Sequence, residues 1–238
     1  MAKQGKRYRT ATAEVDHTAV YTPHEAVSLA RRISNVRFDE TVELHVRLGV
    51  DPRHADQQVR GVALLPNGLG KTVRVLVFAL GEGETIARDA GADYAGGDEL
   101  IKRGEEGFLE FDSAIATPEI MGRIGRLGRV LGRRGLMPNP RAGTVVAPED
   151  LPRAVQEARQ GRVEFRLDRT GIIHAAVGKV SFEDEQLLQN IAALLQSIIL
   201  ARPEAVRAPQ YLKSINLATS MGPGLRLDLA AAVSLQAE

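Results

Sequence analysis

The 238-residue sequence contains no cysteine and no tryptophan, and aromatic residues make up only 4% of it. Without cysteine there can be no disulfide, no thiolate nucleophile and no cysteine-bound metal, and this absence fits a reducing compartment without proving one. Since 44% of the residues are hydrophobic, the core must be mostly aliphatic. The basic N-terminus is not followed by an apolar run, and no apolar segment is long enough to span a bilayer. We therefore predict a soluble, cytoplasmic protein with no membrane partner.

Recognisable catalytic motifs are also missing. The five histidines form neither H-x-x-x-H nor H-E-x-x-H, so their spacing gives no support for zinc, and each is expected to be a surface or structural histidine. The nearest approach to a nucleotide motif is G-E-G-E-T-I at residues 81–86, with Ile86 in place of the third glycine and two carboxylates where a pyrophosphate would lie. We predict no enzyme, no cofactor and no metal, and keep a nucleotide-dependent enzyme as a rival hypothesis.

The hydrophobic periodicity changes twice along the chain. Residues 41–49 alternate apolar and polar side chains, as in a strand with one buried face, and alternation returns at residues 163–167 and 211–218. Between these segments, residues 73–80 form a nearly continuous apolar run, which is typical of a strand buried on both faces of a parallel sheet. The chain thus has an α/β centre between two parts in an antiparallel style.

Helix and strand signals complete this picture. Thr22, Pro23 and Glu25 form a capping box with proline at the first helical position, and Thr117 is expected to cap a later helix. The first twenty residues are expected to be a loosely held basic start. Residues 163–167 and 172–177, separated by a turn, are expected to pair as a hairpin. Further helices are predicted at residues 84–90, 97–104, 149–160 and 183–201, and further strands at 62–65, 92–94, 111–116, 144–146 and 225–229.

The simplest account is a split α+β domain interrupted by an inserted domain. We assign residues 1–68 and 160–238 to the split domain, with an antiparallel sheet and helices. Residues 69–159 then form a Rossmann-like, three-layer α/β insert. Both crossings lie at glycines, where a hinge would be easy. Acidic and basic residues nearly balance in each part, so any affinity for a polyanion must come from local patches.

One such patch lies between Met121 and Gly143, where no acidic residue occurs. Five glycines, at 122, 125, 128, 132 and 135, alternate with arginines that offer planar donors suited to phosphate. The alternative is that the glycines serve turns and close packing, and that the arginines are only a solvated face. The arginines of this Gly/Arg run are Arg123, Arg126, Arg129, Arg133, Arg134 and Arg141.

A second candidate is the loop T-S-M-G-P-G at residues 219–224. Its hydroxyls, exposed glycine backbone and adaptable methionine suit the 2′-hydroxyls and phosphates of a folded RNA. Taken alone, the same residues are also typical of an ordinary turn. Phe38, which precedes the first alternating strand, can equally stack on a base or pack in the core.

Several long stretches, in order, resemble the bacterial form of the large-subunit ribosomal protein L-one family. They are F-D-E-T-V-E-L-H-V-R-L-G-V-D-P-R from residue 38, L-G-R-R-G-L-M-P-N-P-R-A-G-T-V from 131, E-F-R-L-D-R-T-G-I-I-H from 164 and T-S-M-G-P-G from 219. The resemblance implies a two-domain fold with one domain split by the other. It also implies a structural, non-enzymatic protein, monomeric within the cytoplasmic ribosome and bound to the rRNA of the mobile stalk. Two further roles are implied: release of deacylated tRNA from the exit site, and repression of translation through the leader of its own mRNA.

The resemblance also locates the RNA contacts, chiefly in the split domain. Two residues depart from the family pattern: Ser220 stands where a threonine is usual, and Arg133 where a proline is usual. The Gly/Arg run is then expected to make a secondary, sequence-tolerant contact with phosphates of exiting tRNA or neighbouring rRNA. A non-specific nucleic-acid-binding module remains the other alternative. The implied RNA-contact residues are Phe38, Glu164, Phe165, Arg166, Lys179, Thr219, Ser220, Met221, Gly222 and Pro223.

Overall fold

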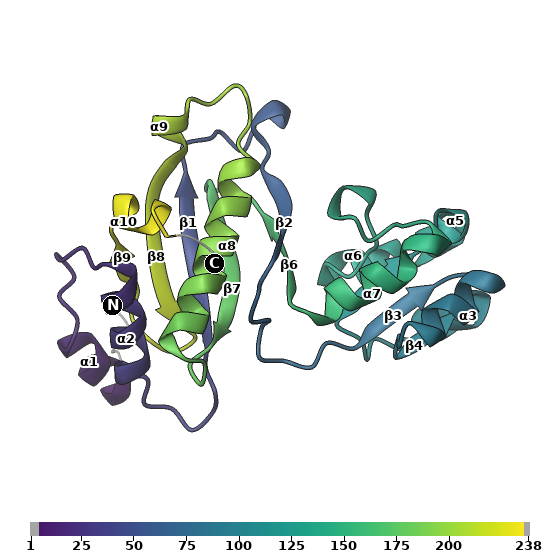
Figure 1. The fold of residues 1–238 in the computed structure, drawn as a ribbon, viewed down its shortest axis with the longest axis horizontal. Helices are drawn as coiled ribbons and strands as arrows, with labels where there is room; N and C mark the ends of the chain where they lie inside the picture. The colour runs from purple at the N-terminus through teal and green to yellow at the C-terminus, as the bar shows by residue number, and fades with distance from the viewer. Residues whose placement is uncertain (1–4, 236–238) are drawn as a thin grey trace. The chain divides into compact units, whose positions relative to one another are not determined.

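The computed structural model describes residues 5–235, and the chain divides into two compact units (Figure 1). One unit combines the residues up to Gly70 with those from Val163 onward, and the other comprises Lys71–Arg162. This is the expected fold class, a split α+β domain interrupted by an α/β insert. The exact junctions expected at residues 68/69 and 159/160 stay a prediction.

The split domain is built on a four-stranded antiparallel sheet in the order β7-β1-β8-β9. In β1, Val42, Leu44, Val46 and Leu48 are buried and face the core, as the alternating pattern predicted. The intervening residues of the same strand point to the opposite face. The strands are β1 (Thr41–Leu48), β7 (Ile172–Lys179), β8 (Leu212–Thr219) and β9 (Leu225–Leu227).

Helices cover the buried face of this sheet. α2 (Pro23–Ile33) begins with the predicted capping box, in which Thr22 and Glu25 bond each other's backbone amides, and buries its apolar side chains in the core. α8 (Asp184–Leu200) packs its apolar stripe on the same side and passes over β7 (Figure 1). Two short helices, α9 (Ala208–Tyr211) and α10 (Leu229–Val233), flank β8 and β9.

The pairing of β6 corrects the hairpin prediction. β6 (Arg162–Arg166) pairs with β2 (Arg60–Leu64) in a separate two-stranded sheet, while β7 pairs with β1. Only an isolated bridge between Leu167 and Ile173 joins the two segments that were expected to pair. The predicted hairpin is therefore wrong. The eight-residue strand β1 pairs with β7 along its length and shares a buried face with it. The short segment at residues 163–167 is not long enough to pair with β7 in this way.

The insert is a three-layer structure around a parallel sheet in the order β4-β3-β5. Every residue of β3 is at most 1% exposed, as the continuous apolar run predicted. Leu76 and Phe78 pack on the α4 side, and Val75 and Val77 pack on the side of α3 and α7. The elements are β3 (Val75–Phe78), α3 (Glu82–Asp89), β4 (Tyr94–Gly96), α4 (Asp98–Glu105), β5 (Ser113–Ala116) and α7 (Leu151–Arg159).

Two local predictions are wrong and a third holds only in part. The strand expected at residues 144–146 is only a single bridge between Ala116 and Val145. Thr117 and Pro118 do occupy the N-cap and first positions of a helical turn, the 3-10 turn Pro118–Ile120. The Thr117 hydroxyl is buried, however, and finds no hydrogen-bond partner in the described structure. The expected loose start forms α1 (Lys6–Ala13), because Ala11 and Val15 are buried in the core of the split domain.

Candidate nucleic-acid interface

The ends of three neighbouring strands of the split domain meet around Thr41. Lys179 Nζ donates to Thr41 Oγ1 at 2.8 Å, since the two residues are partners in the β1–β7 register. The Thr41 amide donates to Ser220 Oγ at 3.2 Å, and the Ser220 amide donates back to the Thr41 carbonyl at 3.1 Å. We call Thr41, Lys179 and Ser220 the strand-end cluster. The cluster fixes one ammonium group and one hydroxyl where β1 begins and where β7 and β8 end.

Two large apolar side chains are exposed beside this cluster. Met221 follows Ser220 directly and is 59% exposed, and Phe38, 56% exposed, precedes Asp39, whose carbonyl accepts a bond from Lys179 at 3.4 Å. Isolated exposed apolar residues are common. Phe38 and Met221, each next in sequence to a residue bonded within or to the strand-end cluster, offer the flat or adaptable contact area that RNA bases require.

The loop after β8 is held tightly. The Gly222 amide donates to the Thr219 carbonyl at 3.1 Å, and a Cβ at Gly222 would lie only 2.4 Å from Thr219 Oγ1. Pro223 is buried and anchors the far side of the loop. The buried Thr219 hydroxyl has no partner in the described structure. The loop therefore presents Met221 on a rigid frame, whereas Thr219 and Pro223 support it from within.

The remaining residues of the implied site, at 164–166, lie elsewhere. They belong to β6, and the residue after it, Leu167, forms an isolated bridge to Ile173 near the start of β7. Lys179 is at the end of β7, about 20 Å further along the strand. Arg166 is exposed, and Glu164 Oε1 accepts a bond from Arg60 Nε at 2.6 Å. Phe165 is 1% exposed and packs on Gly61, so its ring lies in the core, and its expected RNA contact stays a prediction that involves the backbone of this residue.

Between these two ends lies a face of the sheet that the sequence patterns did not single out. Along β1, β7 and β8 the polar side chains opposite the core stay partly exposed, and their register aligns them in rows. The alternation of residues 41–49 predicted that the polar side chains of this strand face outward. It did not predict which residues of β7 and β8 lie beside them. We call this surface the open sheet face; it comprises Glu43, His45, Arg47, His174, Ala176, Ser214, Asn216 and Ala218.

At the centre of the open sheet face two histidines meet. His45 and His174 are register partners, and their Nδ1 atoms lie 2.8 Å apart. Burial, followed by the neighbouring imidazole, holds the pKa of His45 below its usual value, against the opposing effect of Glu43. The nearest ring nitrogen–carboxylate distances are 3.9 Å from His45 to Glu43 and 3.6 Å from His174 to Asp168.

In the insert, the Gly/Arg run forms an interrupted helix. α5 (Met121–Ile124), a 3-10 turn (Gly125–Leu127) and α6 (Gly128–Arg134) follow one another, and Ile124, Leu127 and Leu131 bury one side. The glycines occupy the other side: a Cβ at residues 122, 125, 128 or 132 would meet nothing within 4 Å. Close packing within the chain therefore does not explain these four glycines. Only Gly135, with φ of 70°, serves a turn, as a left-handed helix cap.

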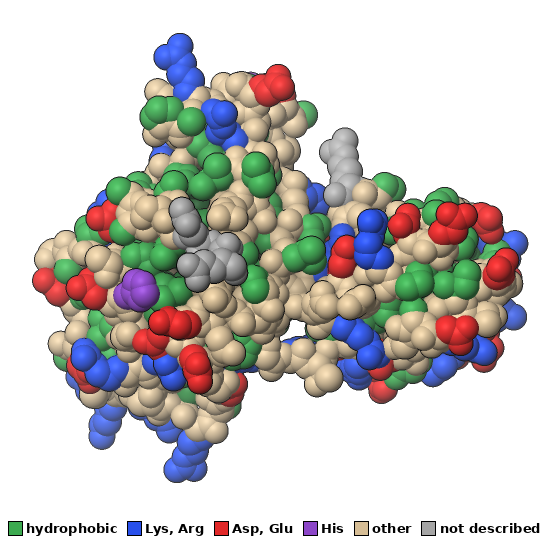
Figure 2. Space-filling view, viewed as in Figure 1, with side chains coloured by type: hydrophobic (Ala, Val, Ile, Leu, Met, Phe, Trp, Pro, Cys, Tyr) green, Lys and Arg blue, Asp and Glu red, His purple; other side chains and the backbone are tan. Residues whose placement is uncertain are grey.

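The arginines of the run differ in their contacts. Arg123 bonds Asp98 at 2.7 Å, whereas Arg126, Arg129, Arg133 and Arg134 are exposed and make no ion pair in the described part of the chain. The side chain of Arg141 lies outside the described residues. Elsewhere on the insert, acidic and basic side chains are interspersed over the visible face (Figure 2). The run is thus a local cationic surface with exposed backbone.

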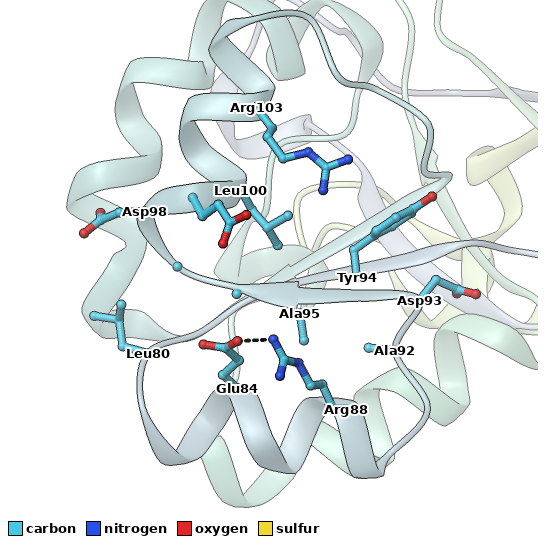
Figure 3. Close-up of a pocket in the computed structure, with 13 residues that line it drawn as sticks. Leu80, Glu84, Arg88, Ala92, Asp93, Tyr94, Ala95, Asp98, Leu100 and Arg103 are labelled. Atoms are coloured by element: carbon cyan, nitrogen blue, oxygen red, sulfur yellow. Dashed lines mark hydrogen bonds and ion pairs between the residues drawn. The ribbon is translucent and has the colours of Figure 1, made fainter.

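A polar cavity of about 590 Å³ lies beside the edge strand β4, between α3 and α4 (Figure 3). Four carboxylates line it, against two arginines, and Arg88 is already bonded to Glu84 of the glycine-rich motif. A nucleotide phosphate would meet surplus negative charge there, so the geometry does not favour the rival nucleotide site. No cluster of three possible metal-ligating residues occurs among the described residues, and no described helix is long and apolar enough to cross a membrane.

The described residues thus form a two-domain protein, in which a split α+β domain with an open sheet face is interrupted by an α/β insert. The family described as "Ribosomal protein L1p/L10e family" matches residues 29–223, and the chain belongs to it. The resemblance found in the sequence is therefore confirmed. The chain is a ribosomal protein, and members of this family reside in the cytoplasmic ribosome and are not enzymes.

Curated relatives support this assignment over the whole chain. A protein of Dehalococcoides mccartyi named "Large ribosomal subunit protein uL1" is 57% identical over 231 residues, which are 97% of this chain and 97% of the relative. Proteins of the same name from Thermomicrobium roseum and Chloroflexus aggregans are 55% and 54% identical, covering 98% and 99% of this chain and 97% and 100% of the relatives.

Proposed function

We propose that this chain binds a folded stalk element of large-subunit rRNA through the strand-end cluster, the loop at 219–224 and the open sheet face. The observation that carries this proposal is the ammonium group of Lys179, which is bonded to Thr41 and to the Asp39 carbonyl next to exposed Phe38, while exposed Met221 follows Ser220 of the same cluster. A positioned cation suits one phosphate, and two exposed apolar side chains suit unstacked bases. Arg166, on β6 near the start of β7, extends the contact, while Glu164 stays paired to Arg60.

Two further roles follow from this proposal and the family. We propose that the chain assists release of deacylated tRNA from the exit site as part of the mobile stalk. We also propose that it represses translation of its own mRNA, whose leader would offer the strand-end cluster the same RNA structure. Repression uses the same RNA site as stalk binding, so a variant that loses stalk RNA should lose repression in parallel.

A second contact is proposed for the Gly/Arg run. Four exposed arginines that form no ion pair within residues 5–235, and four glycines with open space beside them, suit the sugar-phosphate backbone of a second RNA, such as exiting tRNA or neighbouring rRNA. This contact would tolerate changes of sequence, because phosphates carry no base identity.

The test is binding of the full chain to the isolated stalk RNA and to an unrelated structured RNA over a salt series. We expect the stalk RNA to be preferred by about a thousandfold or more, the range usual for specific sites. Met221→Asp should remove this preference, because it places a negative charge against RNA. Leu200→Asp is the matched control, since Leu200 is an 86% exposed apolar residue at the end of α8.

The outcomes separate the hypotheses. Equal binding of both RNAs with a steep salt dependence would instead indicate a non-specific nucleic-acid-binding module. A preference that survives Met221→Asp would contradict the proposed location of the site. Circular dichroism of each variant shows whether a loss of binding reflects unfolding.

A further inference from the structure

The His45–His174 pair constrains where its protons can lie. The rings are register partners on β1 and β7, with centroids 4.9 Å apart, and their Nδ1 atoms are separated by 2.8 Å. Two nitrogen lone pairs at this distance would repel each other, so one proton must lie between them. The remaining question is whether the two Nε2 atoms both carry protons as well.

The carboxylates around the pair favour protons on both Nε2 atoms. Glu43 faces His45 Nε2 at 3.9 Å, and Asp168 faces His174 Nε2 at 3.6 Å. Slight burial would raise the pKa of Asp168, but bonds from Thr170, the Ile172 amide and His174 lower it to about 2, so this carboxylate is charged near neutral pH. With both Nε2 atoms protonated and one proton shared between the Nδ1 atoms, the pair carries one positive charge.

Other features oppose this third proton. The His45 side chain is only 27% exposed, and burial together with the second imidazole lowers its pKa. The row on β8 brings uncharged Ser214, Asn216 and Ala218 to this part of the sheet, and the nearest row on β1 adds the cation Arg47. The contacts therefore act in opposite senses: the two carboxylates favour a cationic pair with three protons, whereas burial and the neighbouring Arg47 favour a neutral pair with two. An added negative charge on the open sheet face would shift this balance.

We propose that the His45–His174 pair is an RNA-contacting group that takes up one proton from solvent when an RNA phosphate binds over the open sheet face. This inference rests on the proposed function. The proton already shared between the two Nδ1 atoms stays there, and the proton taken up binds the Nε2 atom that is bare in the neutral pair. Both rings then carry an Nε2–H group, facing Glu43 and Asp168, and the pair changes from neutral to one positive charge without any covalent step. The RNA is thereby recognised in part by a cation that forms only in the complex.

The sign of the pH dependence follows. The complex binds the extra proton more tightly than the free protein, so affinity for stalk RNA should be highest at low pH and fall as pH rises through the neutral range. One linked proton changes affinity by at most about tenfold per pH unit. We expect the parent protein to bind stalk RNA about tenfold more weakly at pH 8 than at pH 6.

The experiment is calorimetric titration of the full chain with stalk RNA at pH 7 in buffers of different ionisation enthalpy, which counts protons, together with affinities at pH 6 and pH 8. We expect uptake approaching one proton for the parent and near zero for His45→Gln/His174→Gln. His24→Gln is the matched control, because His24 is exposed on α2, which packs against the opposite face of the sheet. It should behave as the parent.

The results distinguish failure of this inference from failure of the proposed function. If stalk RNA is preferred over unrelated RNA but the parent takes up no proton, or if the double variant takes up as many as the parent, the inference is wrong and the proposed function stands. If the stalk RNA is not preferred at any pH, both are wrong. A folding check by circular dichroism on the double variant excludes loss of structure, and Asn replacements at both positions provide a second variant if the Gln pair unfolds.

Discussion

At the scale of single residues, the two departures from the family pattern have different consequences. Ser220 keeps the hydroxyl oxygen that accepts a hydrogen bond from the Thr41 amide at 3.2 Å. The strand-end cluster is therefore complete without the methyl group of a threonine. Arg133 lies within α6, which continues to Arg134 and ends at the left-handed Gly135. With arginine in place of the usual proline, the helix is continuous through residue 133, and the substitution adds an exposed positive charge.

Asp168 offers a prediction on stability and pH. Its carboxylate accepts bonds from the amides of Thr170 and Ile172 and from the Thr170 hydroxyl, at 2.6 to 2.8 Å. Because its pKa falls to about 2 in the folded protein from an ordinary 3.8, the stabilisation is present above pH 4 and disappears as pH falls toward 2. Asp168→Ala should lower the free energy of unfolding by about 1 kcal/mol at pH 7, a figure reduced for the partial exposure of the side chain.

Denaturant unfolding of the parent and Asp168→Ala between pH 2 and pH 7 measures this effect. The two curves should converge near pH 2. Asp56→Ala, in the exposed 3-10 turn Ala55–Gln57, is the control and should change stability little at any pH. A difference that stays constant down to pH 2 would show that the lost interactions do not depend on the charge.

The site residues show what a sequence can reveal at this scale. Ser220, Met221 and Lys179 could be assigned because the resemblance carries them, and Phe38 is exposed beside them. Phe165 could not be judged, since an aromatic residue in an alternating strand is equally compatible with stacking and with the core, and only the contact with Gly61 decides. The His45–His174 pair depends on the register between strands that are 129 residues apart, which no local pattern encodes.

At the scale of elements, local signals were sufficient where the interactions are local. The capping box of α2 and the buried run of β3 could be predicted because neighbouring residues determine them. The hairpin prediction failed because residues 163–167 and 172–177 flank a turn and satisfy every local rule for a hairpin. Their actual partners, β2 for β6 and β1 for β7, lie far away in the chain, so no local pattern indicates them. The single bridge at Val145 likewise depends on β5, not on the segment itself.

The glycines of the Gly/Arg run give a prediction on this scale. Gly125 and Gly128 have helical backbone angles and open space where a Cβ would lie. Replacing each with alanine should therefore raise the free energy of unfolding of the insert by about 0.5 to 1 kcal/mol. Gly135→Ala, at φ of 70°, should lower it by about 1 kcal/mol. Thermal unfolding of the three single variants tests this; destabilisation by Gly125→Ala would indicate a packing role that the structure lacks.

The arginines of the same run give a second prediction. Arg126→Glu/Arg129→Glu/Arg133→Glu should leave affinity for stalk RNA within about twofold, as expected for independent sites, but should weaken binding of tRNA. Arg88→Glu/Arg103→Glu/Arg153→Glu is the control with the same change of charge on other parts of the insert. A large loss of stalk-RNA affinity in the first variant would contradict the assignment of the main site to the split domain.

At the scale of the whole molecule, each unit has a hydrophobic core of its own. Replacing Lys71–Arg162 with a flexible Gly/Ser linker should therefore leave a split domain that unfolds cooperatively and keeps its preference for stalk RNA, since the strand-end cluster draws on no residue of the insert. Circular dichroism and the same RNA competition measure both properties. A folded excision variant with no preference would show that the insert is part of the specific site.

The most direct test of the central claim is to observe which surface the stalk RNA covers. The methionines are suitable probes: Met221 lies beside the strand-end cluster, while Met121 lies at the start of the Gly/Arg run in the insert and Met137 lies within that run, between Arg134 and Arg141. In a titration of methyl-labelled protein with stalk RNA, followed by NMR, we predict that the Met221 signal shifts and those of Met121 and Met137 do not. Shifts at Met121 and Met137 with an unchanged Met221 would contradict the account and place the RNA on the Gly/Arg run.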